Sequence, residues 1–144
     1  MREVRLPLLP AWFRWLGVSA AATVILVFSV LLTLPSGVVT EPFSFVPLDK
    51  WRHFLAYAAF GGALAYATTD WEWSTGRMAI LVLGVTVGFG IGIELWQGFL
   101  PAHHFSFLDA YANALGAVLV SPWYLLRSRV AFVSLRTWIT NVTD

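Results

Sequence analysis

The stretch RMAILVLGVTVGFGIGIELWQGF, residues 77–99, decides the fold class of this chain. It is almost entirely apolar, and no charged residue lies between Arg77 and Glu94. A helix needs about 20 predominantly apolar residues to cross the hydrocarbon core of a bilayer, so this stretch predicts a transmembrane helix. Its length and the lack of alternation between apolar and polar residues exclude a strand of a membrane barrel.

The composition of the whole chain agrees with a membrane protein. Of its 144 residues, 58% are hydrophobic and 12% are charged, and the mean hydropathy is +0.73. A soluble domain of this length could not bury so much apolar surface. Further apolar runs of suitable length lie at 15–34, 52–69 and 108–126. We therefore predict an all-α fold, in which residues 1–144 form a single membrane domain with a bundle of four transmembrane helices.

The basic residues fall mainly on one side of these predicted spans, and cytoplasmic segments near span ends retain Lys and Arg. Both termini are therefore predicted to be cytoplasmic, in a multi-pass protein of the cytoplasmic (inner) membrane. Lys50 and Arg52 are the two cations on the extracytoplasmic side, which holds the loops 35–51 and 100–107. The seven cations on the cytoplasmic side are Arg2, Arg5, Arg14, Arg77, Arg127, Arg129 and Arg136.

Several classes of function are excluded or disfavoured by composition. With no cysteine in the chain, disulfides, thiolate nucleophiles and thiolate metal sites are excluded. A net charge of +1 without a basic, aromatic-rich stripe argues against nucleic acid as a partner. The first apolar run is too long for a cleaved signal peptide. The tail 127–140 alternates Arg with large apolar residues, and is either an interfacial amphipathic helix or simply a basic cytoplasmic tail.

Glycines at four-residue spacing predict close helix packing in the third span. Gly84, Gly88 and Gly92 leave one side of that helix without side chains, which lets a neighbouring backbone approach. The neighbour is either another helix of this chain or a second copy of it, so a homo-oligomer through this face is one prediction. Small residues expected to fit against such a surface are Gly61, Gly62, Ala65, Ala112 and Gly116.

Ionisable residues are concentrated at the extracytoplasmic ends of three spans. Asp49, His53 and Tyr57 follow at steps of four and so lie on one helix face, with Asp49 expected at the N-cap. An imidazole next to charged residues within an apolar run is energetically expensive, which favours a functional role for His53. Glu94 is the strongest single signal, because an unpaired carboxylate at that depth costs about 2.5 kcal/mol or more. Glu94 should face the bundle interior, with Gln97 on the same face.

The fourth span begins with the pattern Ser106-x-x-Asp109, which is typical of a helix cap. Asp109, Asn113 and Gly116 share a face of this helix, so the cap and a buried amide point the same way. The amino-terminal ends of the second and fourth spans would both present partial positive charge and free amides outside. Together with nearby side chains these ends suit an anion such as phosphate or carboxylate; those side chains are Lys50, Arg52, His103 and His104.

Three ordered blocks of residues resemble the VanZ-like family of small membrane proteins. They are Asp-Lys-x-x-His-Phe-x-x-Tyr from Asp49 to Tyr57, Glu-Leu-x-Gln from Glu94 to Gln97, and Phe-Ser-x-x-Asp-x-x-x-Asn-x-x-Gly from Phe105 to Gly116. The resemblance covers about residues 31–120. It implies an association with low-level resistance to the glycopeptide teicoplanin, a family property without an established biochemical activity.

One position departs from that family. The chain has Pro101-Ala102-His103-His104 where the family usually has Arg after the Pro. A permanent cation has become a titratable one, so anion binding is expected to weaken as pH rises.

Three classes of function follow from these residues: an intramembrane enzyme, a non-catalytic binder of a membrane lipid or lipid-linked envelope precursor, and a polar network that only fixes helix packing. In the first, Glu94, His53 and Asp109 are the candidate acid/base residues. A metal site is chemically conceivable, but no close ligand spacing supports one, and no cofactor is predicted. The candidate ligand-binding residues are Asp49, Lys50, Arg52, Tyr57, Gln97, His103, His104 and Asn113.

Overall fold

A computed structural model describes residues 4–31, 48–100 and 106–143 of the chain. The fold is mostly helical, in agreement with the all-α prediction. In chain order the elements are β1 (Val4–Leu8), α1 (Ala11–Leu26), the π-helix η1 (Val27–Leu31), α2 (Leu48–Ala67), α3 (Thr75–Gly98), α4 (Phe107–Val118), α5 (Ser121–Leu126), the 3₁₀ turn η2 (Arg127–Arg129), β2 (Val130–Ser134) and α6 (Leu135–Thr143).

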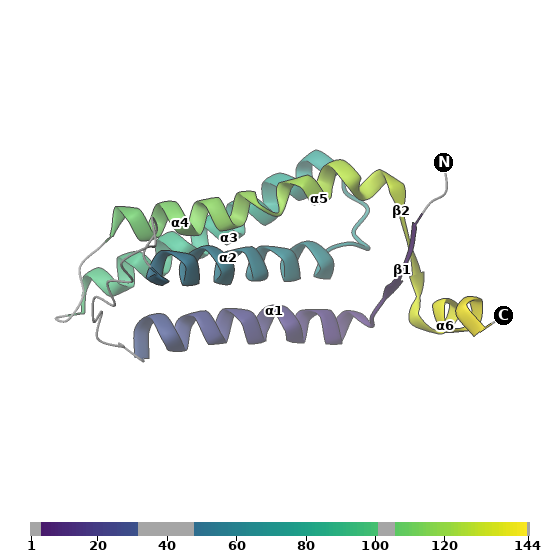
Figure 1. The fold of residues 1–144 in the computed structure, drawn as a ribbon, viewed down its shortest axis with the longest axis horizontal. Helices are drawn as coiled ribbons and strands as arrows, with labels where there is room; N and C mark the ends of the chain where they lie inside the picture. Colours follow the sequence, from purple (N-terminus) through teal and green to yellow (C-terminus); the bar gives the residue numbers. More distant parts are fainter. Residues whose placement is uncertain (1–3, 32–47, 101–105, 144) are drawn as a thin grey trace.

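The long helices form one up-and-down bundle (Figure 1). α2 contacts α1, α3 and α4, and α3 also packs against α4 and α5. α2 and α4 begin, and α3 ends, at the same end of the bundle, which we name the loop end. Both chain termini and the turn between α2 and α3 lie at the opposite end, which we name the terminal end (Figure 1). This arrangement brings residues that are distant in sequence together at each end.

The closest helix contact is between α2 and α4. A Cβ atom at Gly116 would overlap the backbone carbonyl oxygen of Phe54 and lie 3.0 Å from the amide nitrogen of Ala58. A Cβ atom at Gly61 would come close to the side chain of Val120, so there is little room for a side chain at this position. Glycine therefore allows the α2 and α4 backbones to come into contact. Close packing at small residues is typical of helices that associate in lipid, where the hydrophobic effect does not favour association.

The predicted glycine stripe on the third span faces away from the neighbouring helices. Gly84, Gly88 and Gly92 are exposed, and a Cβ atom at any of them would meet nothing within 4 Å among the described residues. The packing glycine of α3 is instead Gly90, on the opposite side of the helix. Of the two alternatives for this stripe, packing against another helix of this chain is not found among the described residues, because periodicity reveals a stripe but not the side on which neighbours lie. Self-association through this open face stays a prediction.

The predicted fourth span is interrupted. α4 ends at Val118 and α5 begins at Ser121, whereas the sequence predicted one helix over 108–126. Pro122 has no amide hydrogen, so it cannot donate to the carbonyl of Val118 four residues earlier. The Ser121 hydroxyl donates to that carbonyl oxygen instead, at 2.7 Å. The break is local, and α5 continues toward the terminal end (Figure 1).

The two ends of the chain form a short parallel pair of strands. β1 pairs with β2, with Val4 opposite Val130 and Leu8 opposite Ser134. The sequence predicts no strand in either segment, and over 127–140 it predicts either an amphipathic helix or a basic tail. Within that tail only the part from Leu135 onward is α-helical. Long-range strand pairing of this kind leaves no periodic signal in so short a segment.

Two helical stretches, Ala11–Val30 and Thr75–Gly98, are long and apolar enough to cross a membrane. Large apolar side chains such as Ile80, Trp96 and Leu125 are also exposed, as is typical of surfaces that contact lipid or a partner. These observations support a membrane location. α2 is polar at its start and the α4–α5 stretch is broken, so the bundle as described supports two of the four predicted spans.

A buried arginine fastens α1 to the terminal end of α2. The Arg14 side chain is 2% exposed, and its guanidinium forms a bidentate pair with the Asp70 carboxylate, at 3.0 Å to Oδ1 and 2.5 Å to Oδ2. It also donates to the carbonyl oxygen of Ala67 at 2.9 Å. The hydrogen bonds from Arg14 hold the pKa of Asp70 below its ordinary value. We call Arg14 and Asp70 the arginine clamp.

Candidate functional site

Five polar side chains from three helices meet at the loop end. α2, α3 and α4 contact one another, and each carries its polar residues within about two turns of this end. The close contact at Gly116 fixes how far α4 lies from α2, and so sets the distance between their side chains. We name the group the loop-end cluster; its members are Lys50, His53, Glu94, Asp109 and Asn113.

Asp109 lies close to two other members of the cluster, Lys50 and His53. Its Oδ1 atom forms an ion pair with the Lys50 ammonium, and the same oxygen lies 3.7 Å from His53 Nε2. Both Asp109 and Lys50 are largely buried, with side chains 18% and 19% exposed. A buried carboxylate with a cationic partner at hydrogen-bonding distance is far more stable than an isolated buried carboxylate. This ion pair joins the start of α2 to the start of α4.

The imidazole of His53 is oriented by Asn113. His53 Nδ1 lies 3.0 Å from the side-chain oxygen of Asn113, which is 2% exposed. An amide oxygen can only accept, so this contact places the proton on Nδ1. In the neutral ring Nε2 then carries the lone pair, and Nε2 is the atom that faces Asp109.

Glu94 is the most buried ionisable group of the cluster, at 1% exposure. Its Oε2 atom accepts a hydrogen bond from the backbone amide of Ser106 at 3.3 Å. Its Oε1 atom is also buried, and none of the described residues donates a hydrogen bond to it. Buried carboxylate oxygens normally accept hydrogen bonds, so the Oε1 atom of Glu94 is available to bind a ligand or a proton.

The cap of α4 explains why Asp109 is available to the cluster. The Ser106 hydroxyl caps the helix by accepting from the Asp109 amide at 3.2 Å. The Ser-x-x-Asp pattern thus marks the start of the helix, but the Asp109 carboxylate, which was the predicted cap, does not cap it. In a complete capping box the side chain at the Asp109 position would return to the Ser106 amide. Here Glu94 from α3 takes that amide, and the Asp109 carboxylate turns to Lys50 and His53. The exchange links the end of α3 to the start of α4.

A second layer of polar atoms lies one turn deeper. Gly90 separates two buried side chains: its Cβ would lie 2.9 Å from the Tyr57 ring and 3.3 Å from Asn113 Nδ2. The Tyr57 hydroxyl and Asn113 Nδ2 are buried, and neither has a hydrogen-bond partner among the described residues. Tyr57 therefore lies beside the cluster, as its four-residue spacing from His53 predicted.

The other predicted site residues are distributed differently. Gln97 is buried but donates to the carbonyl oxygen of Ser29 at 2.6 Å, so its amide ties α3 to η1 and not to the cluster. Arg52 is exposed on α2. α2 begins at Leu48, before the predicted boundary, so Asp49 lies in its first turn and not at the N-cap. The side chain of Asp49, and the residues His103 and His104, lie outside the described part of the chain.

Sequence reasoning missed three contributors to this region. The Ser106 amide holds Glu94, Gly90 makes room for Tyr57 and Asn113, and Ser29 receives Gln97. Ser106 had been identified as a cap, but no sequence signal indicates that its amide is used by another helix. Gly90 breaks the four-residue spacing of the glycine stripe, and that irregularity is the signal that could have revealed it.

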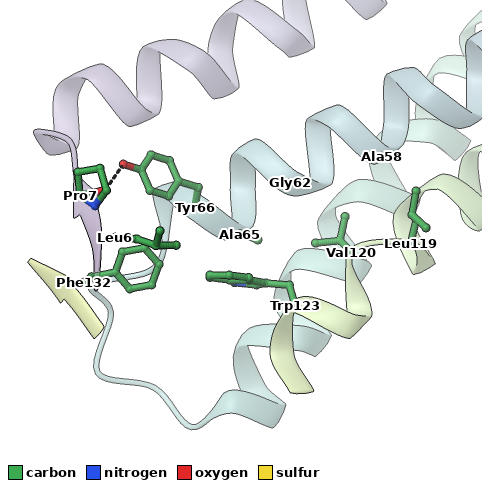
Figure 2. A pocket seen from close by; sticks show the side chains of 10 residues that line it. All are labelled: Leu6, Pro7, Ala58, Gly62, Ala65, Tyr66, Leu119, Val120, Trp123 and Phe132. Atoms are coloured by element: carbon green, nitrogen blue, oxygen red, sulfur yellow. Dashed lines mark hydrogen bonds between the residues drawn. The ribbon is translucent and has the colours of Figure 1, made fainter. Parts of the chain in front are cut away.

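A separate cavity of about 510 Å³ lies toward the terminal end, between α2, the α4–α5 stretch and the strand pair (Figure 2). Its lining is apolar, with Val120, Trp123 and Phe132 among the larger side chains. The Tyr66 hydroxyl is engaged, since it donates to the Pro7 carbonyl oxygen at 3.0 Å and accepts from the Leu9 amide at 3.0 Å. Among the described residues, none of those that line this cavity is charged.

Three side chains of the cluster present lone pairs to one another. His53, Glu94 and Asp109 each offer one nitrogen or oxygen atom, and these atoms all lie within 4.8 Å of each other. Such a set can transfer a proton or bind a cation. No family model, curated protein or solved structure matches this chain. The resemblance to the VanZ-like family accordingly rests on the three sequence blocks.

Proposed function

We propose that this protein is a VanZ-like, four-span protein of the cytoplasmic membrane, with both termini inside and the loop-end cluster at the extracytoplasmic face. There the cluster binds or processes the anionic group of a cell-envelope or lipid-linked ligand. Resistance to teicoplanin is the cellular effect that the family resemblance attaches to this function. The observation that carries the proposal is the convergence of His53, Glu94 and Asp109 from three helices.

The degree of pairing in the cluster favours a working site. A network that serves packing alone is expected to satisfy its own hydrogen bonds, since unpaired buried polar atoms are unfavourable. Glu94 Oε1, Asn113 Nδ2 and the Tyr57 hydroxyl are buried without partners among the described residues. Polar atoms retained in this state are typical of sites that meet a ligand.

The location of the cluster supports an extracytoplasmic site. In the up-and-down bundle both termini lie at the end opposite the cluster (Figure 1). Most of the basic residues belong to the terminal end by sequence, which is the cytoplasmic side by the positive-inside rule. The paired ends of the chain in β1 and β2 agree with termini on one side of the membrane.

An anionic ligand is favoured by the ends of two helices. α2 and α4 both begin at the loop end, so their amide groups and helix dipoles present partial positive charge there. Lys50 adds an ammonium group beside them. In a catalytic version of the function, Glu94 and His53 would act as acid and base, with Asp109 holding Lys50.

A structural role for the cluster is the alternative. It is favoured by the contacts of Lys50 with Asp109 and of His53 with Asn113, which link α2 to α4 within the chain. In that case the protein would be an accessory membrane subunit whose polar network fixes helix packing.

The two functions are separated by isosteric variants in cells. The chain is expressed in a teicoplanin-susceptible host, and the minimal inhibitory concentration is measured beside the amount of folded protein in the membrane. For a working site, Glu94→Gln and His53→Ala abolish protection while abundance stays near wild type. Glu72→Gln, in an exposed carboxylate of the α2–α3 turn, is the matched control and keeps protection. Loss of abundance with Glu94→Gln would support the structural alternative, and absence of protection by wild type would contradict the proposed cellular effect.

A further inference from the structure

The charges of the loop-end cluster do not match an anion site by themselves. Two carboxylates, Glu94 and Asp109, face one ammonium, Lys50, which is already paired with Asp109. With both carboxylates ionised the cluster repels a phosphate or carboxylate. One further positive charge, carried either by a proton or by a metal ion, is needed for balance.

The orientation of His53 is suited to a metal ion as the carrier of this charge. Its Nδ1 proton is directed to Asn113, so the neutral ring presents the Nε2 lone pair to Asp109 Oδ1 at 3.7 Å. Two lone-pair atoms that face each other across this gap attract a cation between them. A histidine whose other ring nitrogen donates to a protein oxygen is the usual form of a metal-ligating histidine, because that bond fixes the ring and its tautomer.

Glu94 provides the second, independent observation. It is 1% exposed, and its Oε1 atom is buried without a donor among the described residues. The Oε2 atom accepts a hydrogen bond from the Ser106 amide at 3.3 Å, which favours this orientation of the carboxylate. One oxygen of this buried carboxylate lies within 4.8 Å of a His53 nitrogen and an Asp109 oxygen, and such surroundings are those of a metal ligand.

We propose that His53 Nε2, the Glu94 carboxylate and the Asp109 carboxylate bind one divalent transition-metal ion of the zinc type. One imidazole and two carboxylates are a suitable donor set for zinc, and three protein ligands leave a fourth position open. Zinc–ligand bonds of about 2.0–2.2 Å put tetrahedral ligand atoms roughly 3.3–3.6 Å apart. The 3.7 Å between His53 and Asp109 is close to this separation, and the full set within 4.8 Å contracts by side-chain rotation.

Lys50 competes with the metal in this arrangement. Its ammonium contacts Asp109 Oδ1, the oxygen that faces His53, so the lysine provides the positive charge in the metal-free protein. Metal binding would displace Lys50 from that oxygen and give the cluster a net positive charge. The displaced ammonium and the open metal position could then hold a phosphate or carboxylate group. Only this last consequence rests on the proposed function; the metal site itself does not.

The proposal is tested by direct metal binding. The full chain is purified in detergent with a chelator, the chelator is removed, and Zn²⁺ is titrated while bound zinc and heat are measured. Wild type is expected to bind about one zinc per chain, and saturating zinc raises its melting temperature, because a ligand of the folded state stabilises it. His53→Ala, Glu94→Gln and Asp109→Asn should each weaken binding at least tenfold, as loss of a ligand does.

Three controls make the result specific. Glu72→Gln removes an exposed carboxylate at the other end of the bundle and leaves binding unchanged. The double variant His103→Ala/His104→Ala removes the only other histidines of the chain and also keeps at least most of the affinity. Lys50→Met removes the competing ammonium, so zinc binds as tightly as to wild type or more tightly. Thermal melts of each metal-free variant show that it is folded.

Several results would overturn the metal site. Absence of zinc binding by the folded wild-type protein would show that a proton alone balances the charge of the cluster. Binding lost only in the His103→Ala/His104→Ala variant assigns zinc to the loop. A loss with Lys50→Met as large as that with Glu94→Gln indicates an ion-pair network only. Protection from teicoplanin without zinc binding contradicts the metal site alone, whereas zinc binding without protection contradicts only the proposed cellular effect.

Discussion

The two ends of the bundle both bury charge, but they treat it differently. At the terminal end the arginine clamp pairs Arg14 with Asp70 by two hydrogen bonds and adds the carbonyl oxygen of Ala67. Of the three guanidinium nitrogens of Arg14, only Nε lacks a partner among the described residues. At the loop end Glu94 keeps one buried oxygen without a donor, and His53 presents a lone pair to a carboxylate oxygen.

This contrast separates a group that holds the fold from a group available for chemistry. Charge that is matched by a bidentate partner fixes two helices together, and its loss is a loss of stability. Charge that is buried but incompletely matched lowers stability, and it persists where a ligand completes it. Variants at the two ends should therefore have opposite signatures, with stability affected at one end and ligand binding at the other.

Apart from the two charged groups, the largest effect on stability is expected at the backbone contact between α2 and α4. Gly116→Ala places a methyl group on the Phe54 carbonyl oxygen, so the helices must separate. Overpacking of a backbone contact should lower the free energy of unfolding by about 3 kcal/mol, measured by titration with a denaturing detergent. Gly88→Ala is the matched control, because its methyl group meets nothing within 4 Å, and stability should not fall because Ala favours the helix over Gly. Equal effects of the two changes would contradict the assignment of the packing face.

The next effect concerns the clamp. Asp70→Asn leaves the Arg14 charge, in a side chain that is 2% exposed, without a counterion. Because the Asp70 side chain is 44% exposed, part of the pair is solvated, and we expect a loss of about 2 kcal/mol in stability. Zinc binding and teicoplanin protection per folded molecule should stay at wild-type values. If Asp70→Asn were as stable as wild type but lacked zinc binding and protection, the terminal end would hold the working site and not a structural ion pair.

The clamp also predicts how stability depends on pH. The pKa of Asp70 is lowered from its ordinary value of 3.8 by the hydrogen bonds from Arg14. The unfolded chain therefore takes up the proton first as pH falls, so this contribution to stability is present above about pH 4 and is lost as pH falls through the folded pKa. Melting temperatures between pH 6 and pH 3 measure it. Asp70→Asn should have a smaller decrease over this range, and an identical decrease would exclude Asp70 as its source.

The smallest effect on stability is expected for Glu94→Gln. The change removes a buried charge that lacks a full set of donors, while the amide oxygen can still accept from Ser106. The free energy of unfolding should change by less than about 1 kcal/mol, or rise. The same detergent titration measures it. A loss as large as that of Asp70→Asn would show that both ends are structural and would remove the contrast.

Much of this arrangement could be predicted because it depends on position along helices. An up-and-down bundle brings the start of α2, the end of α3 and the start of α4 to one end, so the meeting of His53, Glu94 and Asp109 follows from where each lies in its span. The four-residue spacing likewise predicted that Asn113 lies on the face of Asp109. Their contacts agree with both expectations.

The parts that could not be predicted depend on partners distant in sequence. Arg14 was interpreted only as a cytoplasmic cation, because nothing near it in the sequence indicates that Asp70 will pair with it. Gln97 has the spacing of a site residue, yet its partner is a carbonyl oxygen of the π-helical turn η1. Backbone groups carry no sequence signal, so contacts to them appear only in the structure.

The proposed function requires that the loop-end cluster lies on the outer side of the membrane. Because the chain has no cysteine, single cysteines introduced at Arg52 and Trp73, both exposed and at opposite ends of the bundle, can be labelled in intact cells with a membrane-impermeant maleimide. We expect Arg52→Cys to be labelled in intact cells and Trp73→Cys only after permeabilisation. Labelling of Trp73→Cys alone in intact cells, or of both equally, would contradict it.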